Sequence, residues 1–338
     1  MKTILFTEAT NENIEAAAEI IRRGGLLGIP TETVYGLGAD ALNADACRRI
    51  YEAKGRPQDN PLIIHVPDST WLSRYCENVP ESAYRLADEF WPGPLTMILP
   101  KKDVVPYRTT GGLDTVGVRC PNHPVTLAVI RAAGVPVAAP SGNTSGRPSP
   151  TTAADMVEDG KIDGIFDGGA CSVGVESTII DLTCEPPRLL RAGGLPLEEL
   201  QRVLGTVLVD RCITQPVADG EHPRAPGMKY RHYAPKAPVT VVTGDGEKSA
   251  DYIARHAQQG AGVICFSEYR ALFPGRVIHD LGPEGDKSEQ ARRVFDALRE
   301  FDVTGVPEIY AQCPDDAGLG LAIGNRLKKA AGFHVVEV

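Results

Sequence analysis

Residues 29–66, IPTETVYGLGADALNADACRRIYEAKGRPQDNPLIIHV, decide the fold, because they place more polar groups at constrained positions than any other stretch. The apolar run at residues 26–29 predicts a buried strand that leads into this stretch. After Pro30, residues 31–35 are predicted to be extended with side chains on alternate faces, so that Thr31, Thr33 and Tyr35 point the same way. A strand followed by a helix and a second strand predicts an α/β unit built on this stretch.

The helix in this stretch is predicted to turn a lysine inward. Ile50 and Tyr51 share one face, and Lys54 continues that apolar stripe one turn later. Gly55 provides the left-handed residue that ends a helix, so Lys54 and Arg56 form a corner with two cations. Cations at a helix C-terminus also interact with the helix dipole, so this pattern alone leaves a purely structural role open.

A histidine interrupts the second strand of the stretch, Leu-Ile-Ile-His-Val at residues 62–66. Most histidines in apolar strands are hydrogen-bonded core residues, and His65 is open to that interpretation. The alternative is that His65 faces a binding site at the end of the strand. The sequence alone does not decide between the two.

Composition limits the class of protein. With 338 residues, the chain is expected to form about two domains. The eight cysteines include no CxxC pair, so they predict reduced, mostly buried thiols and no zinc site. The sequence has no apolar run long enough to cross a membrane and no signal peptide, so a cytoplasmic protein is expected. The net charge of −9 argues against a basic nucleic-acid-binding domain.

Periodicity divides the chain into three parts. Residues 1–208 mix helices and strands of both orientations, and residues 209–236 form a linker. That linker includes Ala-Pro-Gly-Met-Lys-Tyr-Arg-His-Tyr at residues 225–233, which is too rich in rings and cations for a spacer and predicts a lid. In residues 237–338 the predicted strands 239–242, 263–266, 308–311 and 333–336 alternate with helices. This alternation predicts a small Rossmann-like, three-layer α/β domain.

Three common nucleotide-binding and catalytic motifs are missing from the sequence. There is no Walker A loop, no GxGxxG after a strand and no nucleophile elbow, so covalent serine catalysis is disfavoured. Hydroxyls, amides and cations collect at the ends of predicted strands instead. Without a pair of general-base carboxylates, this set suits the binding of an anion and the stabilisation of developing charge. The residues themselves predict an anion-binding cavity that could take a nucleotide.

Several motifs, in this order, resemble the YrdC-type threonylcarbamoyl-AMP synthases in their long, two-domain form. They are PTETVYGLG at 30–38, Lys54-x-Arg56 with Asn-Pro-Leu at 60–62, WPGPLT at 91–96, APSGN at 139–143 and GVEST at 174–178. The linker motif and the Rossmann-like tail also resemble this form. The resemblance covers essentially the whole chain. It implies a YrdC-like mixed, twisted-sheet domain, the linker and the small Rossmann-like domain.

The resemblance implies a nucleotidyltransferase. L-threonine, bicarbonate or CO2, and ATP would give L-threonylcarbamoyl-AMP and pyrophosphate, which is the first step of N6-threonylcarbamoyladenosine modification of tRNA. Mg2+ would accompany ATP without a metal site made of side chains. The product would pass to a downstream tRNA threonylcarbamoyltransferase complex, and no stable tRNA binding and no membrane partner are expected.

The resemblance also implies roles for individual residues. Catalysis would depend on Lys54 and Arg56. Threonine would be held by Thr33, His65, Arg119, Ala139 and Ser177. ATP would be held by Lys54, Arg56, Asn60, Thr115, Ser141, Asn143, Ser149, Arg191 and Tyr230.

Two other functions fit parts of the sequence. An RNA-binding maturation factor would use the cavity to read RNA directly, although the acidic composition argues against it. A carbamoyl-phosphate-dependent transferase or hydrolase of the same fold would act without threonine.

Overall fold

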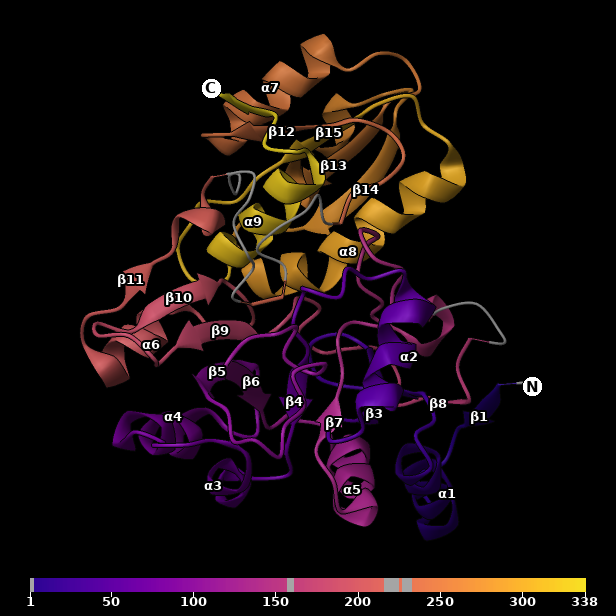
Figure 1. The fold of residues 1–338 in the computed structure, drawn as a ribbon. Helices are drawn as coiled ribbons and strands as arrows, with labels where there is room; N and C mark the ends of the chain where they lie inside the picture. The colour runs from indigo at the N-terminus through magenta and orange to yellow at the C-terminus, as the bar shows by residue number, and fades with distance from the viewer. Residues whose placement is uncertain (1–2, 157–160, 216–224, 227–232) are drawn as a thin grey trace.

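The computed structural model describes residues 3–156, 161–215, 225–226 and 233–338, which form two α/β domains (Figure 1). The first has a mixed sheet of eleven strands in the order β1-β8-β2-β3-β7-β4-β6-β5-β9-β10-β11. Its strands are β1 (Ile4–Phe6), β2 (Leu27–Ile29), β3 (Gly36–Asp40), β4 (Ile63–His65), β5 (Leu95–Pro100), β6 (Thr115–Arg119), β7 (Val137–Ala138), β8 (Gly164–Phe166), β9 (Thr178–Asp181), β10 (Arg188–Arg191) and β11 (Leu208–Val209).

The helices of the first domain are α1 (Asn11–Arg22), α2 (Ala44–Lys54), α3 (Leu72–Tyr75), α4 (Glu81–Phe90), α5 (Pro124–Ala133) and α6 (Leu197–Leu204). In Figure 1, α1, α3, α4 and α5 lie below the strands, and the second domain lies above them. The mixed, twisted-sheet α/β domain predicted from the sequence is confirmed.

The second domain is a parallel sheet between helices. Its strands are β12 (Val239–Thr243), β13 (Gly262–Phe266), β14 (Val277–Gly282), β15 (Ile309–Gln312) and β16 (Val335–Glu337), in the order β14-β13-β15-β12-β16. All the paired strands are parallel. Helix α7 (Gly246–His256) covers one face, and α8 (Lys287–Thr304) and α9 (Gly320–Ala330) lie on the side of the first domain (Figure 1). The predicted three-layer, Rossmann-like domain is confirmed.

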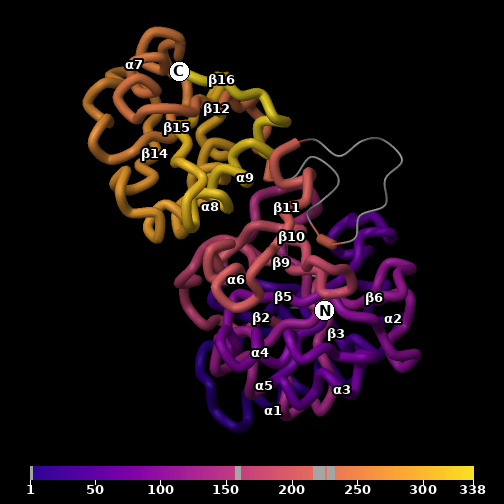
Figure 2. Tube along the Cα trace, turned by 90° about the vertical axis from the view of Figure 1, so that its left-hand side faces the viewer, coloured from indigo at the N-terminus to yellow at the C-terminus, as the bar shows by residue number. Residues whose placement is uncertain are grey.

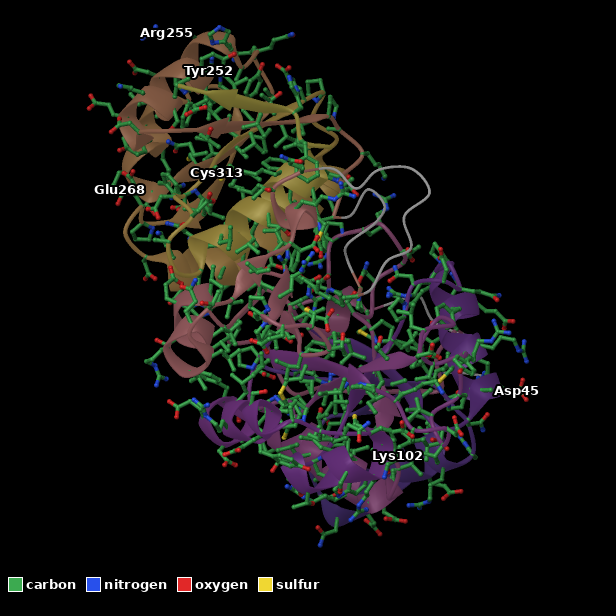
Figure 3. The ribbon with its side chains drawn as sticks, turned by 60° about the vertical axis from the view of Figure 1, so that its left-hand side comes forward. Asp45, Lys102, Tyr252, Arg255, Glu268 and Cys313 are labelled. Carbon is green, nitrogen blue, oxygen red and sulfur yellow. The ribbon has the colours of Figure 1, made fainter. Side chains whose placement is uncertain are left out.

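Local sequence signals account for several elements. Helix α2 begins at the Asn43 cap and ends at Gly55, whose φ of 60° is the left-handed conformation expected there. Helix α8 begins where the Asp286 side chain accepts a hydrogen bond from the Glu289 backbone amide. Asp45, near the start of α2, points away from the protein into solvent (Figure 3).

Two predictions of local structure are wrong. Residues 31–35 form a turn and not an extended segment, because the Thr31 hydroxyl donates to the Val34 carbonyl at 2.7 Å and accepts from the Thr33 amide at 3.1 Å. Side-chain hydroxyls compete with strand pairing in this way. The strand β14 was not predicted, since most of its residues are only partly buried or exposed and do not form an apolar run.

The two domains meet at α8 and α9, and Figure 2 shows both helices on the side of the second domain that faces the first. Gly174 marks how close they come: a Cβ atom there would lie 2.4 Å from the Arg292 Cα in α8. Only glycine fits such an approach. At the rim, Arg147 of the first domain forms an ion pair with Asp302 of α8.

The cysteines are free thiols, as predicted, and all but Cys184 are buried. Cys313, labelled in Figure 3, lies inside the second domain, where burial raises the pKa of its thiol to about 12. Across the part of the chain that the structure describes, no helix has the length and apolar character needed to cross a membrane.

Candidate active site

A polar pocket lies in the first domain where the end of α2, the ends of several strands and the linker converge. The side chains and backbone that line it belong to Val34, Lys54, Arg56, Ile63, His65, Arg119, Ala139, Pro140, Ser141, Asn143, Ser145, Gly146, Glu176, Ser177, Arg191, Pro226 and Tyr233. Nine of the residues predicted from the sequence are among them: Lys54, Arg56, His65, Arg119, Ala139, Ser141, Asn143, Ser177 and Arg191.

Lys54 points inward, as the helical stripe predicted, and its side chain is only 1% exposed. Its Nζ donates hydrogen bonds to the backbone carbonyls of Ser141 and Asn143, and its own carbonyl accepts from the Ser145 amide at 2.9 Å. Lys54 therefore holds the loop after β7 against the end of α2. Burial, and then the charge of Arg56, lower the pKa of Lys54 well below its usual value. A bound polyanion would favour the charged form.

Arg56 is held by the turn that follows it. Its Nη2 donates to the Asn60 side-chain oxygen at 2.7 Å and to the Pro61 carbonyl at 2.9 Å. Burial lowers the pKa of Arg56 to about 10, so it stays charged at neutral pH. Asn60 itself does not line the pocket, because its side chain is used to orient Arg56.

His65 lines the pocket and also packs as a core residue. Its Nδ1 lies 3.3 Å from the Val137 carbonyl. Burial, and then the charge of Arg119, lower the pKa of His65 to about 3. His65 is therefore neutral at physiological pH and can offer one donor and one acceptor.

The low pKa of His65 predicts an acid-sensitive term in folding stability. An unfolded histidine takes up a proton below about pH 6.5, whereas native His65 does not, so stability falls as the pH falls. Between pH 7 and pH 5, the wild type should lose about 2 kcal/mol more unfolding free energy than a His65→Asn variant. Urea denaturation at both pH values measures this difference, and parallel pH dependence of the two proteins would contradict it. The pKa of Glu176 is lowered to about 2, so the stabilisation that its charged form contributes to the fold is lost only at pH values below this window.

Arg119 at the end of β6 is paired with a residue that the sequence did not single out. Its Nη2 lies 2.8 Å from Glu32 Oε2, and both side chains are buried. The same Glu32 oxygen accepts from the Asn122 amide at 3.0 Å. Glu32 is therefore placed to orient the Arg119 guanidinium at the pocket wall.

Ser177 connects two strands beside the pocket through its hydroxyl group. Its hydroxyl lies 2.8 Å from the Thr96 hydroxyl and accepts a hydrogen bond from Arg191 Nη2 at 3.0 Å. Arg191 also donates Nε to the Ser177 carbonyl at 2.9 Å, and burial lowers its pKa to about 10. A hydroxyl and a cation thus face the same cavity from fixed positions.

The electrostatics of the pocket favour anions. Among the described residues, its lining holds the cations Lys54, Arg56, Arg119 and Arg191 and a single carboxylate, that of Glu176. Such a cluster of buried cations is costly unless anions neutralise it. Bound phosphates and a carboxylate would supply that charge.

Comparison with known proteins identifies the family. A family model described as telomere recombination, for Sua5, YciO and YrdC proteins, matches residues 19–193. A model of the C-terminal domain of threonylcarbamoyl-AMP synthase matches residues 195–332. A threonylcarbamoyl-AMP synthase of Pyrococcus abyssi is 49% identical, with 96% of each chain covered. The chain belongs to the threonylcarbamoyl-AMP synthase family.

Further relatives agree with this assignment. The threonylcarbamoyl-AMP synthase of Bacillus subtilis is 45% identical over 97% of this chain and 96% of its own. The crystal structure of P. abyssi Sua5 complexed with L-threonine matches with a TM-score of 0.91 and 47% identity, covering 99% of each chain. Proteins of the threonylcarbamoyl-AMP synthase family are transferases that make an adenylate, and the RNA-binding and carbamoyl-phosphate alternatives gain no support.

Some predicted site residues of this synthase lie outside the pocket lining. Thr33 bonds to Thr31, Ser149 bonds to Glu176, and Thr115 is half-buried at the start of β6. Tyr230 lies outside the described residues. The roles proposed for these residues stay predictions.

Sequence reasoning missed two carboxylates and one cation that matter to the site, namely Glu32, Glu176 and Arg326. Glu32 and Glu176 stand inside the quoted motifs PTETVYGLG and GVEST, next to Thr33 and Ser177. Their position next to predicted site residues could have indicated that these two carboxylates belong to the site. Arg326 lies in α9, far from any site motif.

Proposed function

We propose that this pocket binds L-threonine, bicarbonate or CO2, and ATP, and converts them to L-threonylcarbamoyl-AMP and pyrophosphate. The observation that carries the proposal is the convergence of Lys54, Arg56, Arg119 and Arg191 on one cavity, where the part of the chain that the structure describes contributes a single carboxylate. The P. abyssi structure in complex with L-threonine supports the choice of amino acid, and membership of the threonylcarbamoyl-AMP synthase family supports the reaction.

Threonine is assigned to the wall made by β4, β6 and the start of β9. Arg119 pairs with the substrate carboxylate, as a guanidinium does in a two-point contact. His65 and Ser177 are close enough to the same cavity to bond the substrate hydroxyl. Ala139 provides a small apolar surface beside them.

ATP is assigned to the wall made by α2 and the loop after β7. Lys54 and Arg56 meet the phosphates, with Asn60 orienting Arg56. Ser141 and Asn143 also line the pocket, and Arg191, held by Ser177, completes the anion site. Ser149 and Thr115 are assigned to ATP from the resemblance.

The proposed chemistry needs positioning and charge stabilisation and no covalent enzyme intermediate. The threonine amine adds to CO2 and loses a proton, giving a carbamate. A carbamate oxygen then attacks the α-phosphorus, and the bond to pyrophosphate breaks as its oxygen takes the electron pair. Fixed cations lower the barrier because negative charge grows on the phosphate oxygens during this step.

Magnesium is proposed to enter with the ATP phosphates. Among the described residues there is no group of three or more His, Cys, Asp or Glu side chains that could hold a metal ion. Glu176, the lining carboxylate, is already bonded to Ser149 and Arg326. Mg2+ commonly binds to nucleotide phosphates and water with few protein ligands, and it would supply charge neutralisation there.

Binding of ATP would require the pocket to widen. The cavity encloses about 50 Å3, far less than sites for molecules of this size. Pro226 and Tyr233, from the predicted linker, line the cavity, and the Ala234 amide donates to the Gly146 carbonyl at 3.0 Å. The division into residues 1–208, 209–236 and 237–338, with the middle part as a lid, stays a prediction.

The product is proposed to pass to a tRNA threonylcarbamoyltransferase complex. A carbamate joined to a phosphate is an activated anhydride that water can hydrolyse, so rapid transfer would protect it. A cytoplasmic location is part of this proposal, because the tRNA acceptor would be there.

Mass spectrometry tests the reaction directly. The purified chain is incubated with ATP, threonine, bicarbonate and Mg2+, and the products are identified with each component omitted in turn. Threonylcarbamoyl-AMP and pyrophosphate should form only in the complete mixture. Product without threonine would favour a carbamoyl-phosphate type of enzyme, and no product from a folded protein would reject the proposal.

Substrate preference is a further expected outcome. A pocket that bonds the threonine hydroxyl leaves polar groups unpaired with valine, so valine should give at least roughly 100-fold lower kcat/KM, with serine between them. Competition assays with the three amino acids measure the ratios. Equal use of valine and threonine would show that the hydroxyl is not recognised by this pocket.

A further inference from the structure

Arg326 is a cation of the second domain whose charged group lies in the first. It belongs to α9, is fully buried, and is the largest side chain among the most deeply buried residues. Its Nε donates to Glu176 Oε2 at 2.8 Å, and its Nη1 donates to the Ala192 carbonyl at 2.7 Å. The neighbouring Asn325 donates to the Ile213 carbonyl at 2.8 Å. Helix α9 thus places the Arg326 guanidinium in the domain that holds the pocket, and through Asn325 it contacts the segment after β11.

Glu176 connects Arg326 to the pocket. One of its oxygens bonds to Arg326, and the other accepts from the Ser149 hydroxyl at 2.9 Å. Glu176 lines the pocket itself and immediately precedes Ser177, whose hydroxyl accepts from Arg191. Any shift of Glu176 would therefore move groups on both proposed substrate walls.

A buried carboxylate keeps this position only if it stays ionised. Glu176 is 6% exposed, and burial alone would raise its pKa. The charge of Arg326 is the largest of the opposing effects, followed by that of Arg191, and together they lower the pKa of Glu176 to about 2. If Glu176 were protonated, one of its oxygens would become a hydrogen-bond donor. Glu176 could then not accept hydrogen bonds from both Arg326 and Ser149 as it does now.

We propose that Arg326 is a positioning residue of the active site, supplied by the second domain, which holds Glu176 as an anion in the orientation that Ser149 and Ser177 require. This inference gives the second domain a direct part in the reaction and rests on the proposed function of the pocket. Arg326 acts through Glu176 and does not touch the substrates.

The pH profile of an Arg326→Gln variant tests the proposal. The wild type should show no titration of Glu176 between pH 5.5 and 8. The variant should lose about 10- to 100-fold in kcat near neutral pH and recover part of it as the pH rises and Glu176 ionises. In the double variant R326Q/E176Q this new dependence should disappear, because no carboxylate is left to titrate.

Other ionisable groups face Glu176, and the comparison of variants accounts for them. They are Lys329 beside Arg326 on α9, Arg191 on β10, Lys54 on α2 and Tyr233 in the linker. Burial lowers the pKa of Lys329 to about 8, and the charges of Arg326 and Glu176 also act on it, so the pH profile of E176Q alone is measured to show the part that Lys329 contributes. Only a pH dependence that appears in R326Q and vanishes in the double variant is assigned to Glu176.

An Asp302→Asn variant serves as the matched control, since it removes the ion pair with Arg147 between the same two domains without touching Glu176. It should keep the wild-type pH profile. If the kcat of R326Q does not depend on pH, the proposal is overturned. It is also overturned if the new pH dependence of R326Q persists in R326Q/E176Q. If R326Q does not fold, E176Q alone should show low kcat at every pH, and normal kcat there would also overturn it. If the wild type forms threonylcarbamoyl-AMP, the proposed function holds whatever the variants show. A contrary result with the variants then counts only against the role of Arg326.

Discussion

A Lys54→Met variant is expected to lose roughly 100- to 1,000-fold in kcat, the loss typical of removing one donor to developing negative charge. Two effects combine at this position. The phosphates lose a cation, and the carbonyls of Ser141 and Asn143 lose the donor that orders their loop. Lys54 is not part of the proposed threonine site, so the dissociation constant of threonine should change by less than about 3-fold. Steady-state kinetics and calorimetry give the two quantities.

Arg48→Met is the matched control for this experiment, because Arg48 lies on the same helix with its side chain 46% exposed and paired with Glu52. Its kcat should stay within about 2-fold of the wild type, as expected for a surface ion pair. Thermal melting separates a lost function from a lost fold. A folded Lys54→Met protein with near-normal kcat would show that the corner at the end of α2 does not serve the reaction.

An Arg119→Gln variant is expected to raise the KM for threonine by roughly 100-fold or more, because truncating one member of a desolvated charge pair typically costs several kcal/mol. The substrate carboxylate would lose its cation. Glu32 would also remain buried without its partner, so the single variant should be less stable as well. Initial rates over a range of threonine concentrations measure the effect on KM.

The double variant Arg119→Gln with Glu32→Gln distinguishes the two consequences. Removing both charges leaves no unpaired carboxylate, so stability should recover relative to the single variant while threonine affinity does not. Recovery of threonine affinity together with stability would mean that Arg119 supports the fold and does not bind the substrate. Glu32→Gln alone should keep threonine binding within about 10-fold, since Arg119 keeps its charge.

Local patterns in the sequence were sufficient for α2 and its inward lysine. Helical periodicity places Lys54 on the buried face, and Gly55 ends the helix, so neighbouring residues determine where Lys54 points. The alternation of strands and helices after residue 237 likewise predicted the parallel sheet. Helical periodicity, helix ends and strand–helix alternation depend on residues close together in the sequence, so they could be predicted without knowledge of the tertiary structure. The turn at residues 31–35 was missed because the Thr31 hydroxyl competes with the extended form.

The partners of the charged groups were decided only by the tertiary structure. Arg119 and Arg191 stood out in the sequence as cations at strand ends, but nothing near them indicated that Glu32 pairs with one and Ser177 with the other. Glu176 and Arg326 are 150 residues apart and belong to different domains. Such pairs form because burial makes an unpaired charge costly, and which charges become buried together depends on how the domains pack. The sequence thus determined the family, the domain types and most of the residues that line the pocket, whereas the packing of α9 against the first domain determined how Glu176 is held there.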